Sequence, residues 1–297
     1  MNKINWSEAI FFFDIDDTLI DTAGTTLLAS GSIETELKNV FGEEKANQIK
    51  IRFLEIFDSL LAGYRVKNEL DWENVKGGKS EFEKLLNRIG KMQPRVIINY
   101  GSMKKWSREI FIKLACDDVG VSITSQQIKR ATDAYWNTLS ENSKIFEGVP
   151  SLFQTITFHQ RPIYFITSSD SRMTMADDGL FDYVPLESEK FKRDRIEKLR
   201  KKGLDFAGLA IGDPEDKPSR EFFEKGITLA KFDLGENFKY ENCLMFGDSF
   251  AGDLQTPKEL LGFGLVVLFQ QGFQNTQEVD NQQINVGNID EVIKYLN

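Results

Sequence analysis

The sequence contains few residues of several chemically important types, and each shortage excludes a class of protein. Its 297 residues include one histidine and two cysteines. A metal site built on several histidines is excluded, and His159 leaves one Ser-His or Cys-His pair at most. Cys116 and Cys243 are too few and too scattered for a disulfide framework or a zinc site. Two such thiols suit a reducing compartment, so we expect a cytoplasmic protein.

Long apolar runs and an excess of basic charge are also missing. No apolar run approaches the length of a membrane span, and residues 1–8 lack the basic start and apolar core of a signal peptide. The net charge is −9. Because nucleic acids attract basic surfaces, we expect neither a nucleic acid nor a membrane as partner. A small anionic substrate stays open, since it needs only local positive charge or a bound metal.

Proline is scarce whereas phenylalanine is abundant, with 7 Pro against 24 Phe. Long disordered tracts are therefore not expected. The chain is 41% hydrophobic and long enough to bury a sizeable core. Its length favours about two domains.

The stretch that organises the chain is AIFFFDIDDTL, residues 9–19, in which an apolar run changes abruptly into carboxylates. The first five residues have the length and composition of a strand buried on both faces of a parallel sheet. Asp14 then falls at the carboxyl end of that strand, where ligands bind in open α/β sheets. Since side chains alternate along a strand, Asp14 and Asp16 point the same way.

Two carboxylates that share one site need neutralisation by a proton or by a hard divalent cation. Such a pair can also divide the work of catalysis. One carboxylate attacks an electrophile such as phosphorus, while the other supplies and removes protons. The alternative interpretation is an acidic loop that merely follows a strand.

The chain then changes its hydrophobic period twice. From about residue 33 to 139, apolar residues recur at three- and four-residue spacing, which is typical of helices, and only VIINY at 96–100 is ambiguous. After residue 145, strand candidates alternate with helical patterns, which predicts a parallel sheet. We therefore expect an α/β, Rossmann-like core interrupted by a mainly helical insert. The candidate strands after the insert are 162–166, 206–211, 243–246 and 265–269.

Three further clusters could carry chemistry at the ends of these strands. Thr167 and Ser168 end one strand, where hydroxyls and backbone amides can hold phosphate oxygens, although such residues also simply cap helices. Lys217 precedes Pro218, which we expect at the first position of a helix. The sequence GDSFAGD places Asp248 at a strand tip and Asp253 five residues later, as carboxylate ligands for Mg²⁺. The similar GDPED, residues 212–216, is interpreted as a polar turn.

Together and in this order, these pieces resemble the haloacid dehalogenase-like (HAD) superfamily, in its phosphatase branch. DIDDT matches the DxDxT motif of that family, and FITS matches its apolar run ending in Thr or Ser. KPSREFF matches the lysine motif, and GDSFAGD matches the GDxxxxD acidic motif. The resemblance implies a discontinuous HAD-like core, residues 1–23 and 147–297. It also implies that residues 24–146 form a helical cap of type 1.

The resemblance also implies a role for each matching residue. Asp14 would be the nucleophile that becomes an aspartyl phosphate, and Asp16 the general acid and base. Thr167 would bind the phosphoryl group with Ser168 beside it, and Lys217 would steady its charge and that of Asp14. Mg²⁺ would be held by Asp14, the backbone carbonyl of Asp16 and Asp248, with Asp253 in support.

These roles predict a Mg²⁺-dependent phosphatase that hydrolyses a small phosphorylated metabolite, acting as a monomer or homodimer. A phosphomutase of the same superfamily would keep all four motifs, and a non-catalytic HAD-fold binding protein is the alternative from another class. A dehalogenase is disfavoured, because family members that cleave carbon–halogen bonds lack an acid at the position of Asp16.

Two groups of basic residues stay open as binding elements. Arg52, Arg65 and Lys67 are candidates in the cap for a substrate anion, or solvated residues of helix faces. The basic helix at 187–203 is either a solvated helix or a docking site for an acidic partner.

Overall fold

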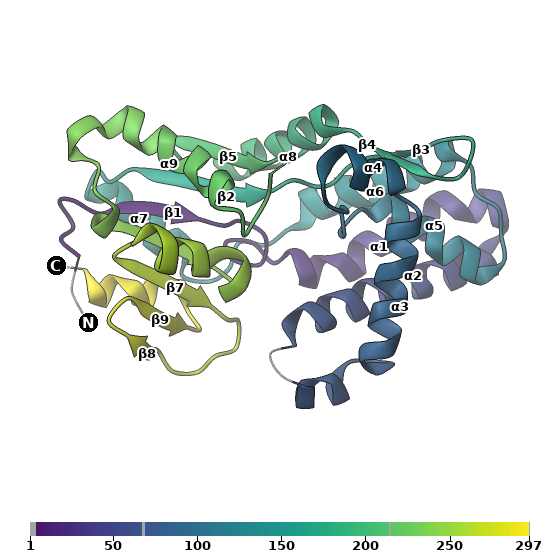
Figure 1. Cartoon of the computed structure of the whole chain (residues 1–297), viewed down its shortest axis with the longest axis horizontal. Helices are drawn as coiled ribbons and strands as arrows, with labels where there is room; N and C mark the ends of the chain where they lie inside the picture. The colour runs from purple at the N-terminus through teal and green to yellow at the C-terminus, as the bar shows by residue number, and fades with distance from the viewer. Residues whose placement is uncertain (1–3, 67–68, 214, 297) are drawn as a thin grey trace. The chain divides into compact units, whose positions relative to one another are not determined.

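The structure is a computed structural model that describes residues 4–66, 69–213 and 215–296. The chain divides into two compact units (Figure 1). The first comprises residues 1–23, 143–169 and 189–297, and the second comprises residues 24–142 and 170–188. Each unit is described by itself below.

The first unit is built on a seven-stranded sheet with the order β5-β2-β1-β6-β7-β9-β8. All neighbouring strands are parallel except β8 and β9, which are antiparallel. The α/β class expected from the sequence is confirmed. The strands are β1 Ile10–Phe13, β2 Ile163–Ser168, β5 Gly208–Gly212, β6 Cys243–Gly247, β7 Leu265–Phe269, β8 Gln277–Asp280 and β9 Gln283–Val286.

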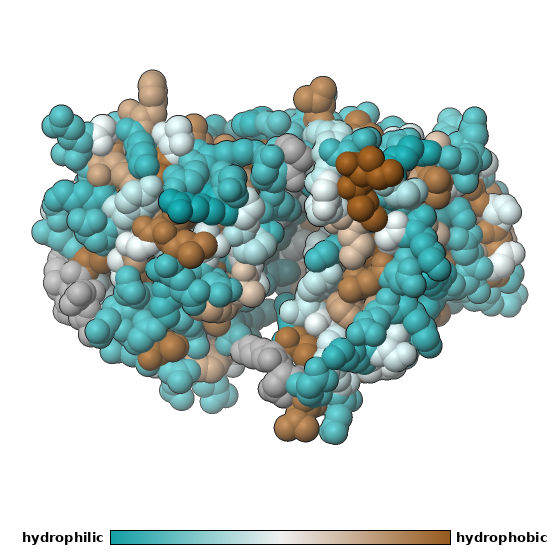
Figure 2. Space-filling view, viewed as in Figure 1, coloured by the Kyte–Doolittle hydropathy of each residue, from teal (hydrophilic) through white to brown (hydrophobic). Residues whose placement is uncertain are grey.

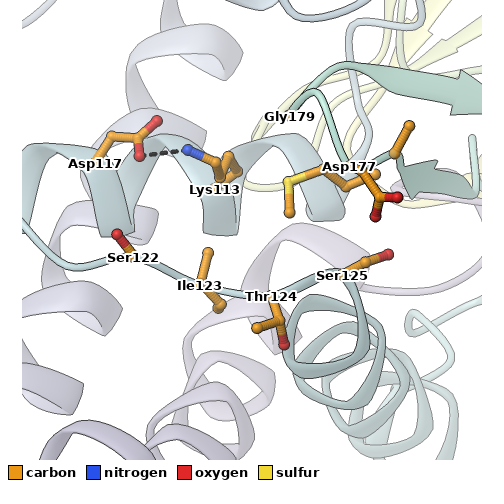
Figure 3. A pocket seen from close by; sticks show the side chains of 10 residues that line it. Lys113, Asp117, Ser122, Ile123, Thr124, Ser125, Asp177 and Gly179 are labelled. Atoms are coloured by element: carbon orange, nitrogen blue, oxygen red, sulfur yellow. Dashed lines mark hydrogen bonds and ion pairs between the residues drawn. The ribbon is translucent and has the colours of Figure 1, made fainter.

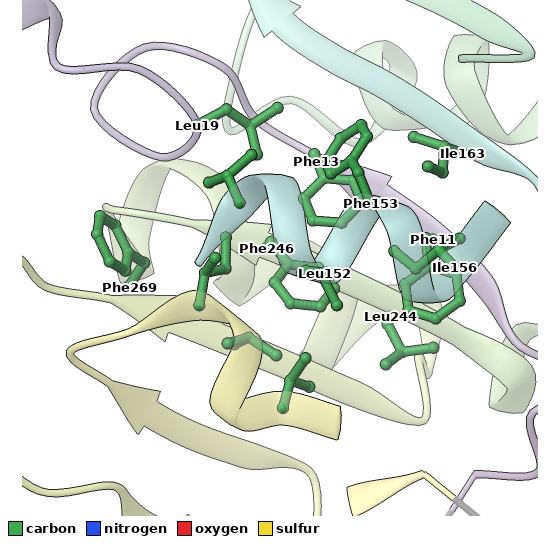
Figure 4. Packing of buried hydrophobic residues seen from close by; sticks show 14 of the residues in the cluster. Phe11, Phe13, Leu19, Leu152, Phe153, Ile156, Ile163, Leu244, Phe246 and Phe269 are labelled. Carbon is green, nitrogen blue, oxygen red and sulfur yellow. The ribbon is translucent and has the colours of Figure 1, made fainter. Parts of the chain in front are cut away.

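The central strand β1 is buried on both faces because its four residues are all apolar. Phe11 and Phe13 point to one face, where α7 (Val149–Phe158) packs through Leu152 and Phe153 (Figure 4). The rings of Phe13 and Phe246, on neighbouring strands, lie 4.4 Å apart. Because both faces are covered, the carboxyl ends of the strands are held in fixed positions.

The other face of the sheet takes the alternate side chains. Ile10 and Phe12 of β1 lie in a second cluster with Phe222 and Phe223 of α9. The helices of the unit are α7 Val149–Phe158, most of α8 Pro185–Arg200, α9 Arg220–Leu234, and the shorter segments η2 Gly235–Asn237, η3 Tyr240–Asn242, η4 Phe250–Leu254, η5 Thr256–Leu261 and η6 Ile289–Tyr295.

The second unit is mainly helical. Its helix α5 packs against α2 and α6, and its interior contains Phe53, Phe111 and Tyr135. The helices are most of α1 Thr22–Phe41, α2 Glu43–Arg65, η1 Glu69–Asn74, α3 Gly78–Lys91, α4 Pro94–Tyr100, α5 Arg108–Val119 and α6 Ser125–Asn142. The ambiguous residues 96–100 are thus helical, with Pro94 in the first turn and Gly101 ending the helix at φ 71°.

A second stretch of chain, residues 170–188, also belongs to this unit. It carries a short antiparallel hairpin, β3 Met173–Met175 and β4 Phe181–Tyr183. Arg172 attaches the stretch to the helices, with donated hydrogen bonds of 2.7 Å to Glu109 in α5 and 2.5 Å to Asp133 in α6. The sequence alone places these residues in the core. The domain boundaries drawn there stay a prediction.

Some local expectations need correction. Helix α9 begins at Arg220 and not at Pro218, because the hydroxyl of Ser219 accepts a hydrogen bond from the backbone NH of Phe222 and caps the helix. The hairpin of β8 and β9 was not anticipated. The residues of β8 are all exposed, so the strand lacks the apolar pattern by which the others were found.

Hydrophilic residues cover most of the face seen in Figure 2, and exposed hydrophobic residues form separate patches. Within the described ranges, no helix has both the length and the apolar character needed to cross a bilayer.

Candidate active site

The sequence-predicted aspartates and lysine come together at one edge of the sheet in the first unit. Strand β1 lies between β2 and β6, and all three run in the same direction. Their carboxyl ends therefore present Asp14, Thr167 and Asp248 at the same edge. The backbone NH of Asp14 donates to the carbonyl of Phe246 at 2.9 Å, which ties the start of this loop to β6.

Lys217 joins two of the acids. Its ammonium donates to Asp14 and, at 2.7 Å, to Asp253. The three side chains are nearly inaccessible to solvent. Burial alone would lower the pKa of Lys217, but the charges of Asp14 and Asp253 hold it above its usual range. Lys217 is therefore a fixed cation within an acidic site.

Asp14, Asp248 and Asp253 form an acidic cluster, with one carboxylate oxygen of each within 4.8 Å of the others. Burial raises the pKa of Asp14 to about 6 against the opposing charge of Lys217, and Asp253 adds to the rise. Burial and the charges of Asp253 and Asp14 also raise the pKa of Asp248 well above its usual value. One lysine thus does not neutralise the cluster, and its oxygen donors suit a hard cation such as Mg²⁺.

Asp16 lies in a different environment, although it is two residues from Asp14. Its carboxylate accepts hydrogen bonds from Lys192 and, at 2.8 Å, from Arg195, both in α8. Thr22 donates a further hydrogen bond at 2.5 Å. Burial alone would raise the pKa of Asp16, but the charges of Arg195 and Lys192 hold it well below its usual range. Asp16 is therefore ionised in this arrangement.

Lys192 and Arg195 are site residues that the sequence analysis did not identify. They belong to the basic segment 187–203, which offered a solvated helix or a docking site as interpretations. The side chain of Lys192 is only 2% exposed. The sequence signal that could have identified them is the i, i+3 spacing of the two cations, which places them on one face of a helix. Their pairing with Asp16, which is 176 and 179 positions away, could not be read from that spacing.

The loop between Asp16 and α1 is held by its own hydrogen bonds. Asp17 adopts a left-handed conformation, with φ 60°, which Asp tolerates better than most residues. Its carboxylate accepts a hydrogen bond of 2.7 Å from the backbone NH of Ala23, and its own NH donates to Ile20. The loop therefore returns directly to the helix start at Thr22.

The two hydroxyl residues at the end of β2 differ in whether their hydroxyl group forms a hydrogen bond. Thr167 is 1% exposed, and its hydroxyl has no hydrogen-bond partner within the described chain. A buried hydroxyl without a partner is costly, so a ligand oxygen would satisfy it. Ser168 donates to Asp216 at 2.7 Å. Asp216, in the segment interpreted as a polar turn, also accepts the backbone NH of Lys217 at 2.8 Å. Pro214 of that segment lies outside the described residues.

The GDSFAGD loop requires glycine at Gly247 because of close packing. A Cβ atom there would lie 2.3 Å from the Cβ of Asp253. The carboxylate of Asp253 also accepts a hydrogen bond of 3.0 Å from the backbone NH of Ser249. The loop therefore folds back on itself and brings Asp253 to Lys217.

The basic residues of the second unit that were candidates for binding an anion gain little support from the structure. Arg52 is paired with Glu55 and Asp118. Arg65 ends α2, and Lys67 lies outside the described residues. A cavity of about 370 Å³ lies between the α5–α6 loop and the β3–β4 turn (Figure 3). Its cation Lys113 is paired with Asp117 at 2.5 Å, and none of the predicted site residues lines it.

Comparison with protein families gives one match. The haloacid dehalogenase-like hydrolase family matches residues 9–260, a range that includes Asp14, Asp248 and Asp253. No curated protein matches the sequence.

Solved structures with this fold cover almost the whole chain. The YfnB protein of Bacillus subtilis, in a magnesium-bound form, has a TM-score of 0.55 at 16% identity, covering 97% of this chain and 98% of its own. A HAD phosphatase from Thermococcus onnurineus has a TM-score of 0.52 at 14% identity, covering 96% of each chain. A Thermotoga maritima protein assigned as a beta-phosphoglucomutase has a TM-score of 0.53 at 15% identity, covering 96% of this chain and 98% of its own. At these identities the likeness supports the fold alone.

Proposed function

Because the chain belongs to the haloacid dehalogenase-like hydrolase family, we propose that it is a Mg²⁺-dependent phosphatase. It would hydrolyse a small phosphorylated metabolite in the cytoplasm through an aspartyl-phosphate intermediate. The observation that carries this proposal is the acidic cluster of Asp14, Asp248 and Asp253, with Lys217 bonded to two of its members. The partner would be this small metabolite, and not a nucleic acid or a membrane. The protein would act as a monomer or a homodimer.

In the first step, an oxygen of Asp14 attacks phosphorus, and the bond from phosphorus to the leaving oxygen breaks. Lys217, held against Asp14, offsets the negative charge of the transferring phosphoryl group. The unpartnered hydroxyl of Thr167 donates to a phosphoryl oxygen. Asp16 handles the protons. Held ionised by Lys192 and Arg195, it takes a proton from the water that hydrolyses the aspartyl phosphate, whereas donating a proton to the leaving oxygen requires that these two cations first withdraw from it.

The metal would be held by the carboxylates of Asp14 and Asp248 and by the main-chain carbonyl of Asp16, with Asp253 in support. When bound, Mg²⁺ supplies positive charge that neutralises phosphoryl oxygens and orients them for displacement. The raised pKa values of Asp14 and Asp248 support this assignment, because a divalent cation would relieve the repulsion that raises them.

The test is phosphate release from a panel of sugar phosphates, nucleotides and a generic aryl phosphate, with Mg²⁺ and with a chelator. Asp14→Asn keeps the shape of the side chain but removes the nucleophile, so turnover should fall by roughly a thousandfold or more. Asp205→Asn is the matched control, since Asp205 is exposed in the same unit and, within the described residues, forms an ion pair only with Arg200.

Metal-dependent release that is lost in Asp14→Asn and kept in Asp205→Asn would support the phosphatase. Wild-type activity in Asp14→Asn would contradict the nucleophile assignment. No release of phosphate from any substrate, by folded protein with Mg²⁺ bound, would favour the phosphomutase or the non-catalytic binding protein.

A further inference from the structure

Arg108, the first residue of α5 in the second unit, is a buried cation that makes no ion pair with the described residues. It is 5% exposed. The other buried arginines of the described ranges, Arg172 and Arg195, both have carboxylate partners. The neighbouring acid, Glu109, accepts hydrogen bonds from Arg172 and Ser107 instead. A buried charge without a counter-ion is costly. An apolar residue at this position would therefore destabilise the fold less than the arginine does.

Four aromatic rings surround the guanidinium group of Arg108. Its central carbon lies 4.9 Å from the ring centre of Phe57 in α2 and 5.6 Å from that of Phe111 in α5. It also lies 5.4 Å from Tyr135 and 5.0 Å from Trp136, both in α6. The rings attract the cation and limit its contact with water. An anion that reaches such a site is bound more strongly than at the surface, because little water screens the charges.

The hydrogen-bond donors of Arg108 are only partly used. Nη1 donates to the carbonyl of Trp106 at 2.7 Å. Nε is buried and has no hydrogen-bond partner within the described chain. No hydrogen bond from Nη2 to a described residue occurs either. Nε and Nη2 form one edge of the guanidinium plane, and this edge matches the two oxygens of a carboxylate or phosphate.

We propose that the Nε–Nη2 edge of Arg108 is a binding site for an oxyanion, either a carboxylate or a phosphate group. This anion is a small free carboxylate or phosphate. The two share the same chemistry at Arg108, because each presents two oxygens to the Nε–Nη2 edge.

The first measurement follows the Nε–Hε signals of arginine in ¹H–¹⁵N spectra of the full chain. Sodium acetate and inorganic phosphate are the probes, with sodium chloride at equal ionic strength as the control. The Arg108 signal should shift and saturate, with a dissociation constant on the order of millimolar. The Arg52 signal should stay in place, because its Nε already donates to Asp118 at 2.6 Å. A static Arg108 signal would overturn the proposal and leave a purely structural cation.

The second measurement is the thermal unfolding of the full chain at increasing concentrations of the same two salts, with sodium chloride as the control. Arg108→Lys keeps the charge but loses the two-pronged edge, so acetate or phosphate should raise the Tm of the wild type and not that of the variant. Arg52→Lys, the same change in the same unit at an arginine with acidic partners, should keep the wild-type response.

The outcomes decide whether Arg108 binds an anion. A shifting Arg108 signal, together with a rise in Tm that Arg108→Lys loses, supports the site, and the salt that acts at the lower concentration identifies the preferred anion. Equal responses of the wild type and Arg108→Lys would overturn it. The titration of the wild type depends neither on whether Arg108→Lys folds nor on the proposed function.

Discussion

Asp14 and Asp16, two residues apart in the chain, have opposite electrostatic environments. Asp14 lies in the acidic cluster, and burial raises its pKa to about 6. Asp16 lies against Lys192 and Arg195, which hold its pKa well below the usual range despite burial. Asp14 therefore shares its one cation, Lys217, with Asp253, whereas Asp16 has two cations of its own. An ionised Asp16 suits the role of a base, and a divalent cation at the acidic cluster would favour the ionised, nucleophilic form of Asp14.

We predict that Mg²⁺ stabilises the protein more at pH 8 than at pH 5. The pKa of Asp14 is about 6 in the folded protein against an ordinary value of 3.8. The folded state therefore holds more protons in this window, and the metal-free protein loses stability as pH rises through it. At pH 5 a proton competes with the metal, so binding should be about tenfold weaker from this group alone. Thermal unfolding with and without Mg²⁺ at both pH values measures this difference.

The control for this experiment is Asp248→Asn, which removes one carboxylate of the cluster. The variant should show a smaller stabilisation by Mg²⁺ at pH 8. Equal stabilisation of the wild type at pH 5 and pH 8 would contradict the assignment of Asp14 as a metal ligand with a raised pKa.

Among the elements, the stretch 170–188 is attached to helices of its unit by a buried ion pair of Arg172, in addition to the pairs of Arg95 in α4 with Asp178 and Asp182. Arg172 bonds to Glu109, which is 1% exposed, and to Asp133. Burial alone would lower the pKa of Arg172, but the charge and hydrogen bond of Glu109 hold it above its usual value. This buried ion pair therefore contributes to the packing of the hairpin, beside the hydrogen bond of 2.7 Å from the backbone NH of Phe181 to the carbonyl of Met92.

We predict that Arg172→Met lowers the free energy of unfolding of the second unit by about 3–5 kcal/mol. The substitution keeps much of the volume but leaves the charge of Glu109 buried without its partner. Denaturation in urea measures the loss. Glu109→Gln in the Arg172→Met background should recover part of it, because the uncompensated charge is then gone. Strictly additive losses would show that the two side chains are not coupled.

For the molecule as a whole, the two cysteines report on the two units separately. Cys116 belongs to the second unit and Cys243 to the first, and both are buried. Burial raises the pKa of Cys116 to about 12 and that of Cys243 further. A thiol with a raised pKa and no access to solvent reacts slowly with electrophiles.

We predict that neither thiol reacts with an aromatic disulfide reagent at pH 8 while the protein is folded. In increasing urea, each thiol should become reactive when its own unit opens. The variants Cys116→Ser and Cys243→Ser assign the two reactions. Rapid labelling of either thiol in the absence of urea would contradict the burial of that cysteine.

Much of the first unit could be predicted because its signals are local. Strand β1 and strand β7 are short apolar runs, and they lie where the sequence placed them, at residues 10–13 and 265–269. Strand β8 could not be found this way, since an exposed edge strand needs no apolar residues. The start of α9 was misplaced by two residues because Ser219 caps the helix after a turn that contains Pro218.

In the candidate site, too, some features have a local signal in the sequence and others do not. By itself the sequence determined that Asp14, Thr167 and Asp248 end three parallel strands, because each directly follows or ends a short apolar run. Parallel strands bring such ends to one edge of a sheet. Only the tertiary structure decided that Lys192 and Arg195 bind Asp16, and that Arg108 is left without an acid. Which acid a buried cation meets depends on how distant segments pack, and no local spacing records it.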